Sequence, residues 1–213
     1  SLWAWGSNGN GQLGQYNRYN KSSPVQIGGT GWADISVGSG CVQALKTDGT
    51  LWTWGRNNKG QLGQGDTVDR SSPVQVGALN TWTTTGCGYY HMGSVKDGQL
   101  WMWGSGSFGK LGRGNTTYYS SPKQVGSLSN WAFISGGKFN TAAVKTDNTF
   151  WAFGGNQYYQ LPKVSPYSFN SPIQVDSGFS RPFNVRRATF GIKTASTLWS
   201  GGNGSNGELG TNS

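Results

Sequence analysis

The chain has 213 residues and a formal net charge of +9, from 17 Lys and Arg against 8 Asp and Glu. No apolar run approaches the ~20 residues of a membrane-spanning helix, so we expect no membrane insertion. The basic balance favours an anionic partner. Because Arg186-Arg187 is the only adjacent basic pair, nucleic acid is compatible with the composition but is not the favoured partner.

The chain opens on a block, LWAWGSNGNGQLG, that recurs along its length. The copies begin at Leu2, Leu51, Leu100, Phe150 and Leu198. A second block, Ser-Pro-x-Gln-Val/Ile, follows the first four copies, and a third block opens at Trp32, Trp82 and Trp131. A repeat of roughly 40–50 residues with several short strands in each unit is typical of a propeller blade or a repeat array.

Four short strands are predicted in the first full repeat, at residues 24–27, 32–37, 41–46 and 51–54. The first opens on Pro24, because a strand tolerates proline at its first position. The dipeptide Asp48-Gly49 predicts a tight type I′ hairpin turn before the fourth strand. Bulky side chains alternate onto both faces of that strand, which indicates a sheet covered on both sides, as in stacked blades.

These patterns predict an all-β fold, a β-propeller of four-stranded antiparallel blades, with about four blades and a partial fifth. We expect a single repeat domain over residues 1–213. Its units span about 2–50, 51–99, 100–149 and 150–197, with a partial unit at 198–213. Apolar burial is carried by rings, since the chain holds 11 Trp, 9 Tyr and 9 Phe and each buried ring removes roughly 150–250 Å² from water.

The blocks LWxWGxNxxGQLG, SPxQV, WxxIxxG and ALKTDG together resemble the repeats of the regulator of chromosome condensation family, in wording closer to its bacterial and viral members. The resemblance covers essentially the whole chain. It implies a propeller that usually closes at seven blades, so we expect part of a larger ring, or an open arc that assembles with itself or with a larger chain. The fourth unit carries Phe153 in place of the second Trp, which indicates a degenerate blade or one adapted for contact.

Residues suited to catalysis or metal binding are scarce. His91 is the only histidine and stands at a framework position of the repeat, which favours a structural role. Cys41 and Cys87 match no metal or redox spacing and are predicted to be part-buried free thiols. Asp66 and Asp69 would serve a glycosidase only with a facing partner. We therefore predict no catalytic residues, no metal site, no cofactor and no enzymatic activity.

The segment between Gln-Leu-Gly and Ser-Pro differs in every unit, although the frame around it repeats. Its Tyr, Arg and Lys side chains suit a binding surface, because Tyr and Arg dominate binding hot spots. Drift in a solvent loop explains the same variation about equally well. The candidate binding residues are Tyr16, Arg18, Tyr19, Lys21, Arg70, Arg113, Tyr118, Tyr119, Lys163 and Tyr167.

One lysine per unit stands beside the predicted hairpin turn. In a propeller these lysines would form a basic rim facing an anion, although a solvated rim that aids solubility is the stronger interpretation. The four are Lys46, Lys96, Lys145 and Lys193.

The leading hypothesis is a non-enzymatic recognition module that binds a protein or a surface glycan through the variable loops of one propeller face. Low charge content and abundant Gly, Asn, Ser, Thr and aromatic residues favour an extracellular or virion-surface adhesin or structural protein over a nuclear one. Two alternatives stay open. The resemblance implies guanine-nucleotide exchange or chromatin binding, and some relatives with this architecture are inhibitors whose ring mouth clamps another protein.

Overall fold

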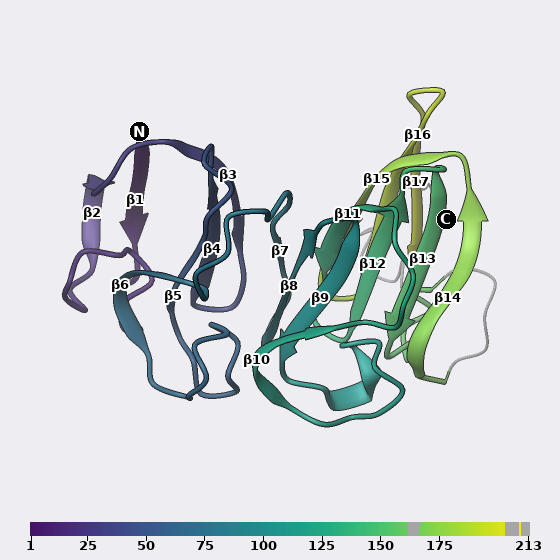
Figure 1. The fold of residues 1–213 in the computed structure, drawn as a ribbon, viewed down its shortest axis with the longest axis horizontal. Coiled ribbons are helices and arrows are strands. Elements are labelled where there is room, and N and C mark those ends of the chain that lie inside the picture. Colours follow the sequence, from purple (N-terminus) through teal and green to yellow (C-terminus); the bar gives the residue numbers. More distant parts are fainter. Residues whose placement is uncertain (162–166, 203–208, 210–213) are drawn as a thin grey trace.

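The computed structural model describes residues 1–161, 167–202 and 209. Over these residues it is built from antiparallel sheets, joined by loops and one short 3-10 helix (Figure 1). Three sheets have four strands each, and they are flanked by a two-stranded sheet at the start and a three-stranded sheet at the end of the described chain. The predicted all-β propeller of four-stranded antiparallel blades is thus confirmed. The partial unit expected at 198–213 is described only at 198–202 and 209.

The strands run in chain order through successive sheets. The two-stranded sheet pairs β1 (Leu2–Gly6) with β2 (Lys21–Ile27). The next sheet contains β3 (Trp32–Val37), β4 (Cys41–Lys46), β5 (Leu51–Gly55) and β6 (Arg70–Gln75). The third contains β7 (Gly86–Cys87), β8 (His91–Lys96), β9 (Gln99–Gly104) and β10 (Tyr119–Gln124), with the 3-10 helix η1 at Ser107–Gly109.

The last two sheets follow the same plan. One contains β11 (Trp131–Gly136), β12 (Asn140–Lys145), β13 (Thr149–Gly154) and β14 (Phe169–Ser177). The other contains β15 (Phe179–Asn184), β16 (Ala188–Lys193) and β17 (Leu198–Gly202). Contacts between sheets run through β3, β7, β11 and β15, so the first strand of each blade lies innermost. A repeat unit that begins at Leu2 or Leu51 therefore supplies the last two strands of one blade and the first two of the next.

The Ser-Pro strands begin earlier than predicted. The first such strand starts at Lys21, so Pro24 lies inside β2 rather than at its start. Two features accommodate the missing N–H of proline. The register of β1 with β2 shifts between Ala4 and Gly6, and β2, like its counterparts β6, β10 and β14, is an outer strand with one unpaired edge.

The hairpin turn predicted at Asp48-Gly49 has a different geometry. Only Gly49 adopts a positive φ, and its N–H bonds to the carbonyl of Lys46, which makes a three-residue loop with a glycine bulge. The type I′ prediction is wrong at this site. A type I′ turn is found one repeat later, where Asp97 and Gly98 both have positive φ and the loop is one residue shorter.

By analogy with residues 32–37, the block that opens at Trp82 would supply the innermost strand of the third sheet, but most of that strand is absent. Only Gly86–Cys87 forms a strand, with an isolated bridge between Trp82 and Lys96. The side chain of Thr84 explains the break, since its hydroxyl accepts the N–H of Val95 at 3.1 Å. A side-chain oxygen has replaced a backbone carbonyl in the ladder.

Large rings fill the spaces between blades. Trp54 and Trp103, the second Trp of the blocks at Leu51 and Leu100, are fully buried. The indole Nε1 of Trp54 donates to the carbonyl of Gln12, and that of Trp103 to the carbonyl of Gln61, both at 2.9 Å. Each ring therefore joins its own blade to the loop of the preceding one. Phe153 fills the same space in the fourth unit without a polar group to donate.

Both cysteines are free, as predicted, and both are buried where part-burial was expected. Burial raises the pKa of the Cys41 thiol to about 12, which leaves it protonated and unreactive at neutral pH.

Candidate functional site

The variable segments form loops at the end of the blades opposite the β4–β5 type hairpins. We call residues 15–20, 64–69 and 113–118 the outer loops; the fourth such segment, which contains Lys163, lies largely outside the described residues. Figure 1 shows the β5–β6 connection and the 3-10 helix gathered along one edge, with the β16–β17 hairpin projecting at the other.

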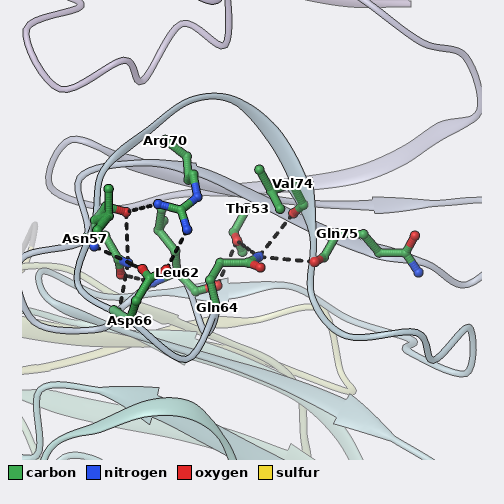
Figure 2. Close-up of polar contacts among 9 residues, drawn as sticks. Thr53, Asn57, Leu62, Gln64, Asp66, Arg70, Val74 and Gln75 are labelled. Atoms are coloured by element: carbon green, nitrogen blue, oxygen red, sulfur yellow. Dashed lines mark hydrogen bonds and ion pairs between the residues drawn. The ribbon is translucent and has the colours of Figure 1, made fainter.

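A buried asparagine holds the second outer loop together (Figure 2). The Nδ2 of Asn57 donates to the carbonyl oxygens of Asp66 and Val68, both at 3.1 Å, while its Oδ1 accepts the N–H of Leu62 at 2.9 Å. Its own N–H donates to Asp69 Oδ1 at 2.8 Å. Because a buried amide left without partners costs free energy, this side chain fixes the loop's path.

Asn8 plays the same part in the first outer loop. Its Nδ2 donates to the carbonyls of Asn17 at 3.0 Å and Tyr19 at 3.1 Å, and its Oδ1 accepts the N–H of Leu13 at 2.9 Å. Gly106 stands at this position in the third unit, and a Cβ there would collide with the carbonyl of Thr117. The third outer loop therefore closes directly onto its own backbone.

Each outer loop is also bonded to the next blade. The N–H of Tyr16 donates to Ser71 O at 2.8 Å, that of Gly65 to Ser120 O at 2.8 Å, and that of Gly114 to Asn170 O at 2.7 Å. All three donor residues have positive φ, with values of 60, 84 and 76°. Two are glycine, the residue that this conformation favours, and one is tyrosine. An exposed Tyr16 thus occupies a position whose backbone suits glycine.

The predicted binding residues fall into two groups. The tyrosines at the tips project into solvent: the exposed fractions of Tyr16, Tyr19, Tyr118 and Tyr167 are 82, 75, 47 and 76%. Lys21 is half-buried at the start of β2. The guanidinium of Arg18 reaches across to Asp69 of the neighbouring loop at 3.4 Å.

Arg70 and Arg113 turn inward instead. Arg70 donates to Val68 O at 2.8 Å and pairs with Asp66 at 2.6 Å. Arg113 donates to Gln124 O and lies 5.2 Å from the ring of Tyr119, a residue half-buried beside it. These two arginines hold loops in place and do not present a free charge to a partner.

The two loop aspartates are likewise occupied. The N–H of Val68, together with Arg70 and Asn57, lowers the pKa of the Asp66 carboxyl. Asp69 accepts from Asn57 and Arg18. Both carboxylates stabilise loop structure, which explains an acidic pair in this position without a reaction for it to perform.

Each of the four rim lysines ends the second strand of its blade, and its ammonium group rests on an aromatic ring of the same blade. The Nζ of Lys46 lies 4.4 Å from the Trp52 ring centre, and that of Lys145 lies 4.3 Å from Trp151. Lys96 contacts Trp101 and pairs with Asp97 at 3.1 Å. Lys193 lies over Trp199 and pairs with Asp176 at 3.7 Å. Cation–π contact thus accounts for much of this rim.

His91 is buried and hydrogen bonded to Thr141 at 2.8 Å. Because Thr141 Oγ1 donates its own proton to Lys110 O, His91 Nε2 is the donor of this pair. Burial lowers the pKa of His91 well below its usual range.

Over the described residues, no three His, Cys, Asp or Glu side chains are grouped as metal ligands would be. Nor does any helix there combine the length and apolar character needed to cross a bilayer.

Sequence reasoning missed the asparagine scaffold. Asn8 and Asn57 sit within Gly- and Asn-rich stretches, where a turn role is the ordinary interpretation. Their partners within the outer loops lie nine to twelve positions further on, as the Asn57 contacts with Asp66 and Asp69 show. The signal available was that the same asparagine recurs in units whose following loops differ.

Comparison with known proteins adds two findings. The family model for the regulator of chromosome condensation (RCC1) repeat matches residues 1–45, 48–95 and 97–144, and a second model of the same description matches residues 32–61. A search of curated proteins returned no significant match.

Solved structures share the fold. Human WBSCR16 aligns with a TM-score of 0.84 at 17% identity, covering 98% of this chain and 58% of that one. Yeast RCC1 (Prp20), bound to Kap60, gives a TM-score of 0.79 at 17% identity, with coverage of 95% and 52%. Prp20p from Saccharomyces cerevisiae gives 0.79 at 20% identity, with 94% and 52%. The chain therefore spans between half and three fifths of the length of these proteins.

Proposed function

This chain belongs to the regulator of chromosome condensation (RCC1) repeat family, and on that premise we propose that it is a non-enzymatic module that binds a partner protein through its outer loops. Two structures of one relative, yeast Prp20, support a protein partner. One was solved in complex with Kap60, and the other was studied for its binding to Gsp1p and histones. These partners belong to that relative; the likeness to this chain concerns the fold.

The observation that carries the proposal is the pairing of rigid loop bases with exposed aromatic tips. Each outer loop is bonded to the next blade through one backbone N–H, and the first two also to a buried asparagine. The tips nevertheless expose Tyr16, Tyr19 and Tyr118. Tyrosine supplies large contact area at a low entropy cost, and a fixed loop reduces the ordering that binding requires.

Tyr16 strengthens this interpretation. Its φ of 60° is a conformation that glycine adopts at the matching positions of the next two loops. An L-residue in the left-handed region costs about 1–2 kcal/mol. Strained residues cluster at functional sites, and here the strain places a ring in solvent.

The test compares capture of partners from the native source by biotinylated protein. We expect a variant with Tyr16, Tyr19 and Tyr118 all changed to Ser to lose the proteins that the wild type enriches. A matched control, Leu79→Ser with Leu128→Ser, changes exposed apolar side chains near the opposite end of the blades and should keep them. Equal enrichment by both variants would contradict the proposal, provided that their melting temperatures match.

The finer alternatives give different outcomes in parallel assays. Binding to an array of surface glycans, lost in the tyrosine variant, would support a carbohydrate ligand and the extracellular or virion-surface role. Accelerated nucleotide release from a Ran-type GTPase would support exchange activity, and retention on nucleosomes would support chromatin binding. Inhibition of an enzyme captured with the wild type would support the clamp type of inhibitor.

A further inference from the structure

A second set of loops that differ between units lies at the axis of the propeller. We call residues 38–40, 88–90, 137–139 and 185–187 the inner loops, since each joins the innermost strand of a blade to its neighbour. They surround a hollow of about 310 Å³. Side chains from all four reach it: Ser39, Tyr89, Lys138 and Arg186.

Five cations belong to this region, and two of them reach the hollow. Lys138 and Arg186 line it directly. The guanidinium of Arg56 lies 5.1 Å from the ring centre of Tyr90, and Lys110 approaches the same ring at 6.0 Å. Lys138 also lies over the rings of Tyr89 and Phe139, at 5.4 and 4.8 Å. Arg187 lies 4.6 Å from Tyr158, whose ring contacts Phe139. The rings of Tyr89 and Tyr90 lie 4.5 Å apart and connect these contacts into one cluster, which Arg186 adjoins at the hollow.

No ion pair between described residues joins any of these five cations to a carboxylate. This separates them from Arg18, Arg70, Lys96 and Lys193, each of which has an aspartate within 4.0 Å. The pKa values of two neighbouring groups are shifted. Burial and the charge of Lys138 lower the pKa of the Lys110 ammonium to about 8. Hydrogen bonding from Ser39, with the charges of Lys138 and Arg186, lowers the pKa of the Tyr89 phenol.

We propose that the inner loops form a binding site for a carboxylate-rich segment of a partner protein, held by Lys138 and Arg186 with Arg56 and Arg187 nearby. Lys110 adds positive charge from inside the protein, since it is only 3% exposed. The site rests on the proposed function, because it gives the partner a chemical character and a second contact with the same end of the molecule. Unpaired cations that rings hold in place are preorganised donors for carboxylates. An acidic segment would relieve the repulsion among them.

The arrangement suits an acidic peptide better than a nucleic acid. Bases bind by stacking on free ring faces, whereas Tyr90, Phe139 and Tyr158 each already contact a cation or another ring. Lys138 and Arg186 line a single hollow of about 310 Å³.

The experiment measures binding of a fluorescently labelled oligo-glutamate peptide by anisotropy. Three single variants each remove one positive charge: Lys138→Gln and Arg186→Gln in the site, and Lys123→Gln on the exposed outer strand β10. We expect each site variant to weaken binding by about tenfold, the effect of losing one charge-assisted contact. Lys123→Gln should change it less than about twofold. Melting temperatures of all three should match the wild type, since none of these side chains is buried.

Three results would overturn the inference: no binding by the wild type, an equal loss with Lys123→Gln, or tighter binding of a single-stranded oligonucleotide that the same site variants abolish. Substituting Tyr16 and Tyr19 distinguishes a failure of this inference from a failure of the proposed function. Tyr16→Ser with Tyr19→Ser should leave peptide affinity unchanged while removing partner capture. If the wild type captures partners through its tyrosines but does not bind the peptide, the inner-loop site is wrong. If the wild type binds the peptide but partner capture does not depend on the tyrosines, the outer-loop role is wrong.

Discussion

The second and third outer loops stand on the same frame and are closed in different ways. Residues 64–69 wrap around the buried amide of Asn57 and balance Asp66 with Arg70. Residues 113–118 have no such amide and close onto Gly106, where a side chain would meet the carbonyls of Thr116 and Thr117. The frame thus requires a filled loop interior with its carbonyls satisfied, which either a side chain or the backbone can supply. Residues at the loop tips do not fill the loop interior or satisfy its carbonyls, so they can differ between units.

Adding one methyl group to the third loop should give the largest effect. Gly106→Ala forces a Cβ into the carbonyls of the loop, and we expect a loss of about 3 kcal/mol in the free energy of unfolding. Gly9→Ala is the matched control, because no atom lies within 4 Å of the added Cβ there. Urea denaturation measures both. Equal costs for the two substitutions would show that the third loop is not closed on its backbone.

Removing the side chain that fills the second outer loop is the reverse experiment. Asn57→Ala leaves the N–H of Leu62 and the carbonyls of Asp66 and Val68 without their partner. The expected cost is about 2 kcal/mol. The exposed neighbour Asn58→Ala should cost less than about 0.5 kcal/mol. Susceptibility of residues 64–69 to protease should rise in the first variant alone; an intact loop would mean that the next blade is enough to hold it.

Lowering the pH should affect the second and third outer loops differently, because Asp66 lies in the second. Its pKa is lowered in the folded protein, so its contribution is complete above the ordinary carboxyl pKa of about 3.9 and is lost as pH falls through the lowered value. An NMR titration of the Val68 amide against pH monitors protonation of the Asp66 carboxyl. Arg70→Gln should move the midpoint upward, with a stability cost below about 1 kcal/mol. Residues 113–118 contain no Asp or Glu, so their amides should not follow the same curve.

The smallest expected effect concerns the first loop. Tyr16→Gly should raise stability by about 0.5 kcal/mol, because relief of the positive φ slightly exceeds the entropy that glycine loses on folding. Tyr19→Gly, at a residue whose φ is not positive, should lower it. Chemical denaturation compares them. A stability loss with Tyr16→Gly would mean that the ring makes a stabilising contact, and that the tyrosine needs no binding role to explain it.

Much of the fold could be predicted because repeated apolar spacing reports burial directly. The strands expected at 32–37 and 41–46 have those bounds in the structure. The errors arose where one side chain altered the backbone. Thr84 interrupts an inner strand, and the glycine bulge at Gly49 lengthens a hairpin.

The candidate site was less predictable for a related reason. The exposed tyrosines were found because their loops vary visibly between units. The cluster around Lys138 and Tyr90 was missed because its members come from different blades and adjoin only after the sheets stack. Charge counts along the chain also could not show which cations have a carboxylate beside them. Asp69 pairs with Arg18 from another unit, while Arg56 has no such partner among the described residues.

The offset between repeat unit and blade has a genetic consequence. Each unit that starts at Leu2, Leu51 or Leu100 ends in the middle of a sheet, whose remaining strands come from the next unit. Unequal recombination between two matching points in the gene therefore inserts or deletes one whole period, and every sheet spanning the junction still receives four strands. Ring size in such a gene can change in single steps without passing through a protein with a severed blade.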